Sequence, residues 1–201
     1  MSTDGTPNGD DQADILASLG DPARFAAVFE RHVVGIYRYH ARRVGSNDAE
    51  DLTAETFADA FRHRARYQPD RGSARAWLFG IATNLLLHHH RGESRRLAAH
   101  GRIVPVMVSE SAENRLVDRL YSAARLDAAL RAIGPELRDV VMLIAVAELT
   151  YDETAAALDI PIGTVRSRLW RARRELREAL DPSEGSWILP LSSATEGCCD
   201  D

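Results

Sequence analysis

The sequence predicts an all-α fold made of two small helical domains that are joined by a flexible linker. Apolar residues recur at helical spacing through most of the 201-residue chain, and no strand pattern is strong enough to indicate a sheet. A stretch that contains Gly101, Pro105 and Ser109 lacks a sustained helical period and divides this pattern. A chain of this length can bury one sizeable core or two small ones. The division of the helical pattern favours two small cores.

The first domain is expected at residues 21–97, after a flexible leader over residues 1–20. Asp21-Pro22 supplies an N-cap and a proline for the first helical turn. Residues 45–48, Gly-Ser-Asn-Asp, end that helix and begin a second one. Residues 68–73 form a turn by composition, and a third helix follows.

Helical spacing assigns core-facing residues to the second and third helices. The stripe of the second helix consists of Ala54, Phe57, Ala58, Phe61 and Ala65. The core face of the third helix consists of Leu78, Ile81 and Leu85. Its opposite face carries Gly80, Asn84, Leu87 and Arg91.

The second domain is expected at residues 113–180, after a linker at residues 98–112. A short strand over residues 103–108 is an alternative within that linker. Gly134-Pro135 separates two helices in the first part of the second domain. Residues 181–201 form an acidic tail with a short apolar island, and we hypothesise that this tail folds back on a basic face of the protein.

Residues 150–180 predict a helix-turn-helix. Thr150 and Glu153 form a capping box, which begins a short helix and contributes about 1 kcal/mol. Asp159-Ile160-Pro161 interrupts the helical pattern, because the residue before a proline disfavours helical dihedrals. The second helix then places Val165, Leu169, Ala172 and Leu176 on one face. Its other face is polar and can enter a groove.

The second helix of this motif is strongly basic. Residues 163–178 contain six arginines and two glutamates, a local charge of +4, whereas the whole chain carries −5. Guanidinium groups pair bidentately with phosphates and with guanine edges. A solvated amphipathic helix is the alternative for a charge run, but the order of short helix, tight turn and basic helix favours DNA binding.

Other classes of function lack support in the sequence. His88, His89 and His90 are consecutive, so their side chains project about 100° apart on a helix and do not converge on a metal ion. We find no nucleophile set or glycine-rich phosphate loop, and we therefore expect no enzyme, no metal and no cofactor. The longest apolar run, residues 140–147, is too short to span a bilayer. Cys198 and Cys199 are adjacent and cannot form a disulfide that cross-links the fold, which favours a reducing compartment. We therefore expect a cytoplasmic protein without membrane insertion.

Three blocks of the sequence together resemble one family. Residues 51–57 read DLTAETF, residues 77–85 read WLFGIATNL, and residues 160–169 read IPIGTVRSRL. In this order they resemble a sigma factor of bacterial RNA polymerase, and more narrowly the small two-domain extracytoplasmic-function (ECF) group. The resemblance covers residues 21–180. Several blocks in order are more specific than a lone helix-turn-helix.

The resemblance implies a sigma factor that directs RNA polymerase core to promoters and initiates transcription by recognising and melting them. Its implied partners are the β and β′ subunits of the core, promoter DNA and an anti-sigma factor. Core binding would fall to Asp51, Leu52, Glu55 and Phe57. The minus-ten element would contact Gln68, Asp70, Arg71, Ser73, Asn84, His88 and Arg91. The minus-thirty-five element would contact Thr164, Arg166, Ser167, Arg168, Arg171 and Arg174.

The chain departs from the family pattern at three positions. Asp159 replaces a glycine that is common in the turn, Thr154 replaces a usual aliphatic residue, and Thr83 stands where many relatives carry a basic residue. Aspartate tolerates left-handed dihedrals better than most residues, so the turn is expected to form.

Two other functions stay open from the sequence. A transcription regulator could bind DNA through the same helix-turn-helix without joining core polymerase. A pure interaction protein could use its basic faces for acidic partners. Dependence of DNA binding on the core enzyme distinguishes the first from a sigma factor, and sequence-specific DNA binding excludes the second.

Overall fold

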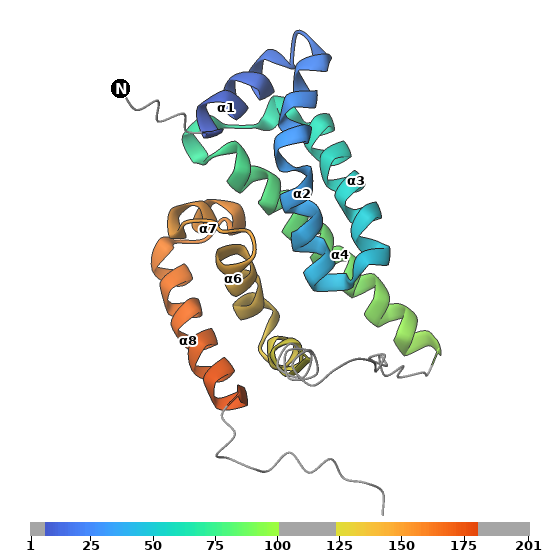
Figure 1. The fold of residues 1–201 in the computed structure, drawn as a ribbon, viewed down its shortest axis with the longest axis vertical. Coiled ribbons are helices and arrows are strands. Elements are labelled where there is room, and N and C mark those ends of the chain that lie inside the picture. Colours follow the sequence, from blue (N-terminus) through green and yellow to red (C-terminus); the bar gives the residue numbers. More distant parts are fainter. Residues whose placement is uncertain (1–6, 101–123, 181–201) are drawn as a thin grey trace, which may run out of the picture.

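The computed structural model describes residues 7–100 and 124–180, and these ranges contain helices and short connections without any strand (Figure 1). The all-α prediction is confirmed. The first half consists of α1 (Pro7–Ala17), η1 (Pro22–Arg24), α2 (Phe25–Val44), α3 (Ser46–His63), η2 (Arg64–Arg66), η3 (Pro69–Arg71) and α4 (Ala74–His100). The second half consists of helical residues 124–132, α6 (Pro135–Ala145), α7 (Tyr151–Leu158) and α8 (Ile162–Leu180).

Helix α1 occupies much of the segment for which the sequence predicted a flexible leader, and that prediction is wrong for residues 7–20. Two carboxylates anchor α1 to α2. Asp11 accepts a hydrogen bond from Arg31 Nε at 2.6 Å, and Asp14 accepts one from Arg31 Nη2 at 2.5 Å. The bond from Arg31 holds the pKa of Asp14 below its ordinary value. Residues 1–6 lie outside the described ranges.

The predicted helix starts and stops of the first half are largely confirmed. Asp21 caps the entry to α2 through a hydrogen bond from Ala23 N at 3.2 Å, and Pro22 follows in the first turn. Gly45, with a φ of +84°, separates α2 from α3, in a conformation that only glycine adopts readily. Gly72 precedes α4, which continues to His100 and therefore extends three residues past the predicted domain end. The rest of the predicted linker, its alternative strand and the tail at residues 181–201 lie outside the described ranges.

The buried face of α3 differs from the predicted apolar stripe. Ala54, Ala58 and Ala65 are exposed, and the buried residues of α3 are Ala49, Leu52, Thr53, Thr56, Phe57 and Ala60. The two threonines are compatible with burial because their hydroxyls donate to backbone carbonyls of the same helix. Thr53 Oγ1 donates to Ala49 O at 2.6 Å, and Thr56 Oγ1 donates to Leu52 O at 2.7 Å.

Helix α4 is covered from two sides. It packs on α2 and α3 on one side and on α7 on the other. Leu78 is fully buried as predicted, whereas Ile81 and Leu85 are only half-buried. The remaining buried residues of α4 include Phe79, Gly80, Ala82, Thr83 and Leu86. Gly80 is therefore buried, although the sequence placed it on the open face.

The helix-turn-helix and its capping box are confirmed. Glu153 N donates to Thr150 Oγ1 at 3.2 Å, and Thr150 N donates back to Glu153 Oε2 at 3.0 Å. Asp159 ends α7 in the left-handed region, with a φ of +52°. Val165, Leu169 and Ala172 of α8 are buried as the helical spacing predicts, against α6 and α7.

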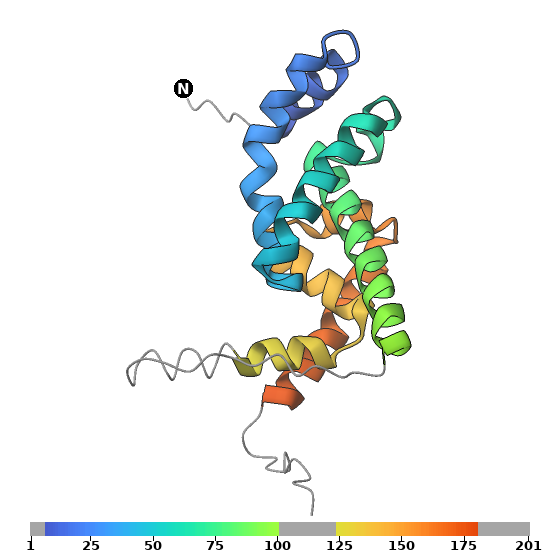
Figure 2. The same cartoon turned by 90° about the vertical axis from the view of Figure 1, so that its right-hand side faces the viewer.

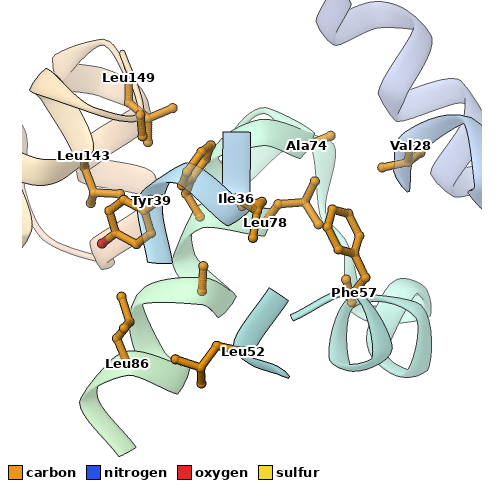
Figure 3. Close-up of a cluster of buried hydrophobic side chains, with 14 of the residues drawn as sticks. Val28, Ile36, Tyr39, Leu52, Phe57, Ala74, Leu78, Leu86, Leu143 and Leu149 are labelled. Atoms are coloured by element: carbon orange, nitrogen blue, oxygen red, sulfur yellow. The ribbon is translucent and has the colours of Figure 1, made fainter. Parts of the chain in front are cut away.

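The two halves of the chain share their largest apolar core. Leu143 and Leu149 of the second half join Tyr39, Leu78 and other residues of the first half in one cluster (Figure 3). Beside this cluster, Arg43 of α2 donates to Asp139 of α6 at 2.7 Å, with only 3% and 7% of the two side chains exposed. Figures 1 and 2 show the α6–α8 group lying against α4, so the described halves form one packed unit.

Candidate nucleic-acid interface

The exposed face of α8 is polar and basic. Arg166, Ser167, Arg171 and Arg174 are all exposed, on the side of the helix opposite the buried Val165 and Leu169. Ser167 Oγ donates to Thr164 O at 3.0 Å, which fixes the hydroxyl at the start of the helix. A helix whose first turns present arginine and serine to solvent can place these groups against base edges and phosphates in the major groove.

Trp170 is a residue on this face that the sequence-based assignment missed. Its side chain is 65% exposed, and the Arg174 guanidinium lies 5.3 Å from the ring centroid. An exposed tryptophan on a charged helix face is unusual for a monomer surface, because it leaves a large apolar area in water. Its helical spacing, three residues after Ser167, was the signal that could have identified it.

Two of the predicted minus-thirty-five residues do not lie on the open face. Arg168 is half-buried and forms an ion pair with Glu136 of α6. Thr164 is also half-buried. The structure therefore brings four of the six predicted residues together on one surface and assigns Arg168 a contact within the protein.

The loop at residues 68–73 borders a cavity of about 360 Å³. Tyr67 and Trp77 form one wall, with ring centroids 5.2 Å apart, and Arg66 and Arg71 also line the cavity. Tyr67 OH donates to Gly72 O at 3.2 Å, and burial raises the pKa of this tyrosine. Tyr67 is only 6% exposed, so Trp77 is the aromatic residue of this wall that can stack an unpaired base, and the arginines can neutralise its phosphate.

Helix α4 presents the other predicted minus-ten residues. Asn84, His88 and Arg91 are exposed and recur at helical spacing, so they share one face. Asn84 and His88 line a cavity of about 310 Å³ together with Trp77 and Arg66. Trp77 also lines the cavity beside the loop, so the loop and the α4 face form adjacent surfaces. Gln68, Asp70 and Arg71 are exposed, and Ser73 is half-buried.

The predicted core-binding residues divide into two groups. Asp51 and Glu55 are exposed on α3 and offer two carboxylates one helical turn apart. Leu52 and Phe57 are only 6% and 5% exposed and belong to the core. The structure therefore does not favour direct contact of these two apolar side chains with a partner. They pack in the core beneath α3.

No metal-binding group is evident in the described parts of the chain, where no three His, Cys, Asp or Glu side chains gather in a suitable cluster. His89 instead lies 3.4 Å from Asp48 of α3. The surfaces described above present arginine, carboxylate, amide, hydroxyl and aromatic side chains.

Two family models match the chain. Sigma-70 region 2 matches residues 28–96, which include α3 and most of α4, and Sigma-70 region 4 matches residues 123–176, which include the helix-turn-helix. The chain is 36% identical over 172 residues to the ECF RNA polymerase sigma factor SigE of Mycolicibacterium smegmatis, covering 83% of this chain. It is 30% identical over 173 residues to ECF RNA polymerase sigma factor SigL of Mycobacterium tuberculosis, covering 82% of this chain and 93% of SigL.

The chain belongs to the ECF sigma factors of the sigma-70 family. The matched part spans 66% of SigE and 63% of a third relative, ECF RNA polymerase sigma factor BldN of Streptomyces coelicolor, which is 32% identical over 167 residues. These relatives are thus longer than the aligned region. The resemblance that the sequence motifs indicated is confirmed.

Solved structures agree with the fold of this ECF family member. CnrH, solved in complex with the cytosolic domain of CnrY, superposes with a TM-score of 0.61 at 26% identity, covering 85% of this chain and 97% of that chain. Sigma factor RpoE of Bartonella quintana, solved with the anti-sigma factor NepR, has a TM-score of 0.62 at 23% identity. The match covers 78% of this chain and 96% of that chain. Within the described ranges, none of the helices of this family member has both the length and the apolar character needed to cross a membrane.

Proposed function

We propose that the chain is a sigma factor that binds core RNA polymerase and directs it to promoters through two separate DNA-binding surfaces. The observation that carries the proposal is the exposed arginine and serine face of α8, in a chain that matches both region 2 and region 4 of the sigma-70 family. The role is one of binding, in the cytoplasm where the chromosome and the polymerase are located.

The α8 face is proposed to bind the minus-thirty-five element as duplex. Arg171 and Ser167 point away from the buried side of α8 and are suited to base edges, while Arg166 on the flank is suited to phosphates. Trp170 extends this face with an apolar surface that can contact a thymine methyl group. Arg174, beside the Trp170 ring, adds a further cation.

The loop at residues 68–73 and the exposed face of α4 are proposed to hold the minus-ten strand after melting. An unstacked base needs a stacking surface and hydrogen-bond donors. Trp77, which is half-buried and borders both cavities, supplies the first, and Gln68 and Asn84 supply the second from neighbouring surfaces.

Core polymerase is proposed to bind α3 through Asp51 and Glu55, which are exposed carboxylates on one face. Charge reversal at both positions places like charges against a basic partner, at a cost of several kcal/mol. Asp51→Arg with Glu55→Arg is therefore expected to weaken core binding tenfold or more, measured by fluorescence anisotropy of labelled sigma factor titrated with purified core. Glu50→Arg is the matched control, because Glu50 is exposed on α3 about 100° from Asp51.

The result also separates the alternatives. If the parent chain binds duplex DNA but does not bind core polymerase, it is the helix-turn-helix regulator and not a sigma factor. Core binding that is equally strong in the double variant would leave the proposed role intact but reject α3 as the contact surface.

An anti-sigma factor is proposed as a further partner. The support is that CnrH and RpoE, two sigma-fold structures that this chain resembles, were solved with such partners or with a cytosolic domain bound. A partner of this kind is expected to compete with core polymerase, so that its addition lowers the anisotropy of the labelled sigma–core complex. Simultaneous binding of both would contradict that expectation.

A further inference from the structure

We propose that a cavity between α2, α4, α6 and the helical residues 124–132 binds a compact anion that carries two or more phosphate groups. The cavity has a volume of about 310 Å³, and four arginines line it, namely Arg42, Arg43, Arg131 and Arg138. The described residues that line it include none of the predicted contacts with promoter DNA or core polymerase. The inference therefore does not depend on the proposed function.

Positive charge predominates around this cavity. Asp127 also lines it and pairs with Arg131 of the same helix, and Asp139 pairs with Arg43. Four guanidinium groups and two carboxylates leave a surplus of two positive charges among these six side chains. Guanidinium groups bind phosphate oxygens in a bidentate geometry, which a monatomic anion such as chloride cannot satisfy. The charge and the donor type therefore favour a phosphate-bearing ligand.

Arg43 is the buried donor of the cavity. Only 3% of its side chain is exposed, and its Nη2 donates to Asp139 Oδ1 at 2.7 Å. Its Nε and Nη1 are buried and have no hydrogen-bond partner in the parts of the chain that the structure describes. A buried donor without an acceptor costs free energy, and the cost is larger for a charged group. Phosphate oxygens in the cavity that Arg43 lines can supply these acceptors.

Arg138 is held in position by backbone carbonyls. Its Nε donates to Leu130 O at 2.6 Å, and its Nη2 donates to Arg131 O at 2.6 Å and to Ile133 O at 3.2 Å. These bonds fix the guanidinium before a ligand binds, which reduces the entropy lost on binding. Burial lowers the pKa of Arg138, and repulsion from Arg43 adds to this effect. An anion beside both groups would relieve the repulsion.

The size and the walls of the cavity restrict the ligand. A volume of about 310 Å³ lies at the lower end of the range for small-molecule sites, roughly 300–1,000 Å³, so the ligand is compact. Leu130 and Met142 supply the apolar part of the lining, and the arginines outnumber them. Because the arginines come from three separate helices, a ligand with two phosphate groups can engage more than one of them. Inorganic pyrophosphate is the smallest ligand of this class.

Two substitutions at exposed positions test the site in the full chain. Arg42 and Arg131 are exposed, so Arg42→Gln with Arg131→Gln removes two charges from the cavity and leaves the buried Arg43–Asp139 pair intact. Binding of inorganic pyrophosphate is measured by isothermal titration calorimetry at constant ionic strength. We expect saturable binding at one site in the parent protein and at least tenfold weaker binding in the double variant.

Two further variants make the result specific to the cavity. Arg62→Gln with Arg177→Gln is the matched control, because it removes the same charge from exposed positions outside the cavity, and we expect less than a twofold change. Asp127→Asn removes the carboxylate that pairs with Arg131, and it is expected to tighten pyrophosphate binding at least threefold. A gain of affinity cannot arise from a variant that fails to fold.

Thermal unfolding gives an independent measurement. A ligand that binds only the folded protein raises its Tm, so pyrophosphate is expected to raise the Tm of the parent and of the matched control, but not that of Arg42→Gln with Arg131→Gln. Adenosine diphosphate in place of pyrophosphate distinguishes two sources of the phosphate groups. Tighter binding of the nucleotide, with the same dependence on Arg42 and Arg131, would support a nucleotide ligand, whereas equal or weaker binding would support inorganic pyrophosphate.

No saturable pyrophosphate binding in the parent, or equal affinity in the parent and in Arg42→Gln with Arg131→Gln, would overturn the inference. It would also be overturned if a 20-nucleotide single strand needed these two arginines for binding while pyrophosphate did not bind, because this surface would then contact nucleic acid. Neither result changes the test of core binding, which uses other residues.

Discussion

At the residue scale, His40 makes the stability of the folded protein depend on pH. It is fully buried, and its Nε2 lies 3.0 Å from Thr56 Oγ1. Burial, with a smaller effect of Arg43, lowers the pKa of His40 from 6.5 to about 4. The unfolded chain thus gains a proton near pH 6.5, whereas the folded chain gains it only near pH 4. Acid in this range favours the unfolded state.

We therefore expect the free energy of unfolding to fall as pH decreases from 6.5 to 4, by up to about 3 kcal/mol from this residue. Urea denaturation at several pH values measures the change. His40→Gln, which keeps a side chain able to bond Thr56, is expected to flatten the dependence over this range. An identical slope in the variant would show that other groups cause it. The lowered pKa of Asp14 adds a further loss below pH 3.8.

Arg171 tests whether the α8 face recognises sequence. It is exposed on the side opposite the buried residues, so Arg171→Ala should leave folding unchanged. If Arg171 contacts a base edge, the variant loses about 1–3 kcal/mol of binding to the cognate duplex and little on a scrambled duplex. Titrations of both duplexes at several salt concentrations measure this. An equal loss on both, with a salt slope reduced by about one, would indicate a phosphate contact instead.

At the element scale, local signals predicted α7 and α8 well, because each rests on neighbouring residues. The capping box joins Thr150 to Glu153, and the turn depends on Asp159 and the proline that follows Ile160. The same kind of signal placed Asp21 at the start of the α2 region and Gly45 at its end. Elements defined by short-range chemistry are thus visible in the sequence.

Two elements escaped prediction because distant residues determine them. Helix α1 carries few apolar residues, but Asp11 and Asp14 pair with Arg31 in another helix, so the segment is ordered by contacts that are distant in the sequence. On α3, buried Thr53 and Thr56 interrupt the apolar periodicity, and their hydroxyls are satisfied by the backbone. A prediction from hydrophobicity alone therefore assigns the wrong residues to the buried face of α3.

The capping box gives a prediction for the helix-turn-helix. Thr150→Ala removes the acceptor for Glu153 N and should lower the free energy of unfolding by about 1 kcal/mol. Thr150→Ser keeps the hydroxyl and is expected to stay close to the parent protein. Guanidinium denaturation followed by circular dichroism compares the three. Equal stability of the alanine and serine variants would argue against the cap.

At the scale of the whole molecule, the arrangement of the two halves was the feature that the sequence could not supply. Helical spacing predicted two small cores, whereas Leu143 and Leu149 bury themselves with Tyr39 of α2 (Figure 3). Gly80, predicted on an open face, packs against the backbone of α7. Helical periodicity gives the face of each helix but not its neighbour, so contacts between the halves need three-dimensional information.

The candidate site also combines features that the sequence predicts with contacts that it does not predict. Exposed arginines on α8 followed from spacing within one helix, whereas Asp51 and Glu55 on α3 came from the resemblance to the family. The pairing of Arg168 with Glu136 and of Arg71 with Asp159 joins residues far apart in the sequence. The first pair leaves Arg168 only half-buried within the protein, whereas Arg71 stays exposed beside Asp159.

The most direct test of the proposed function is run-off transcription with purified core polymerase on a fragment library of the host genome, with and without this protein. We predict discrete new transcripts that require the protein and whose start sites share two spaced upstream elements. Duplex binding without any core-dependent transcript would contradict the sigma-factor role and favour a regulator that never joins the polymerase.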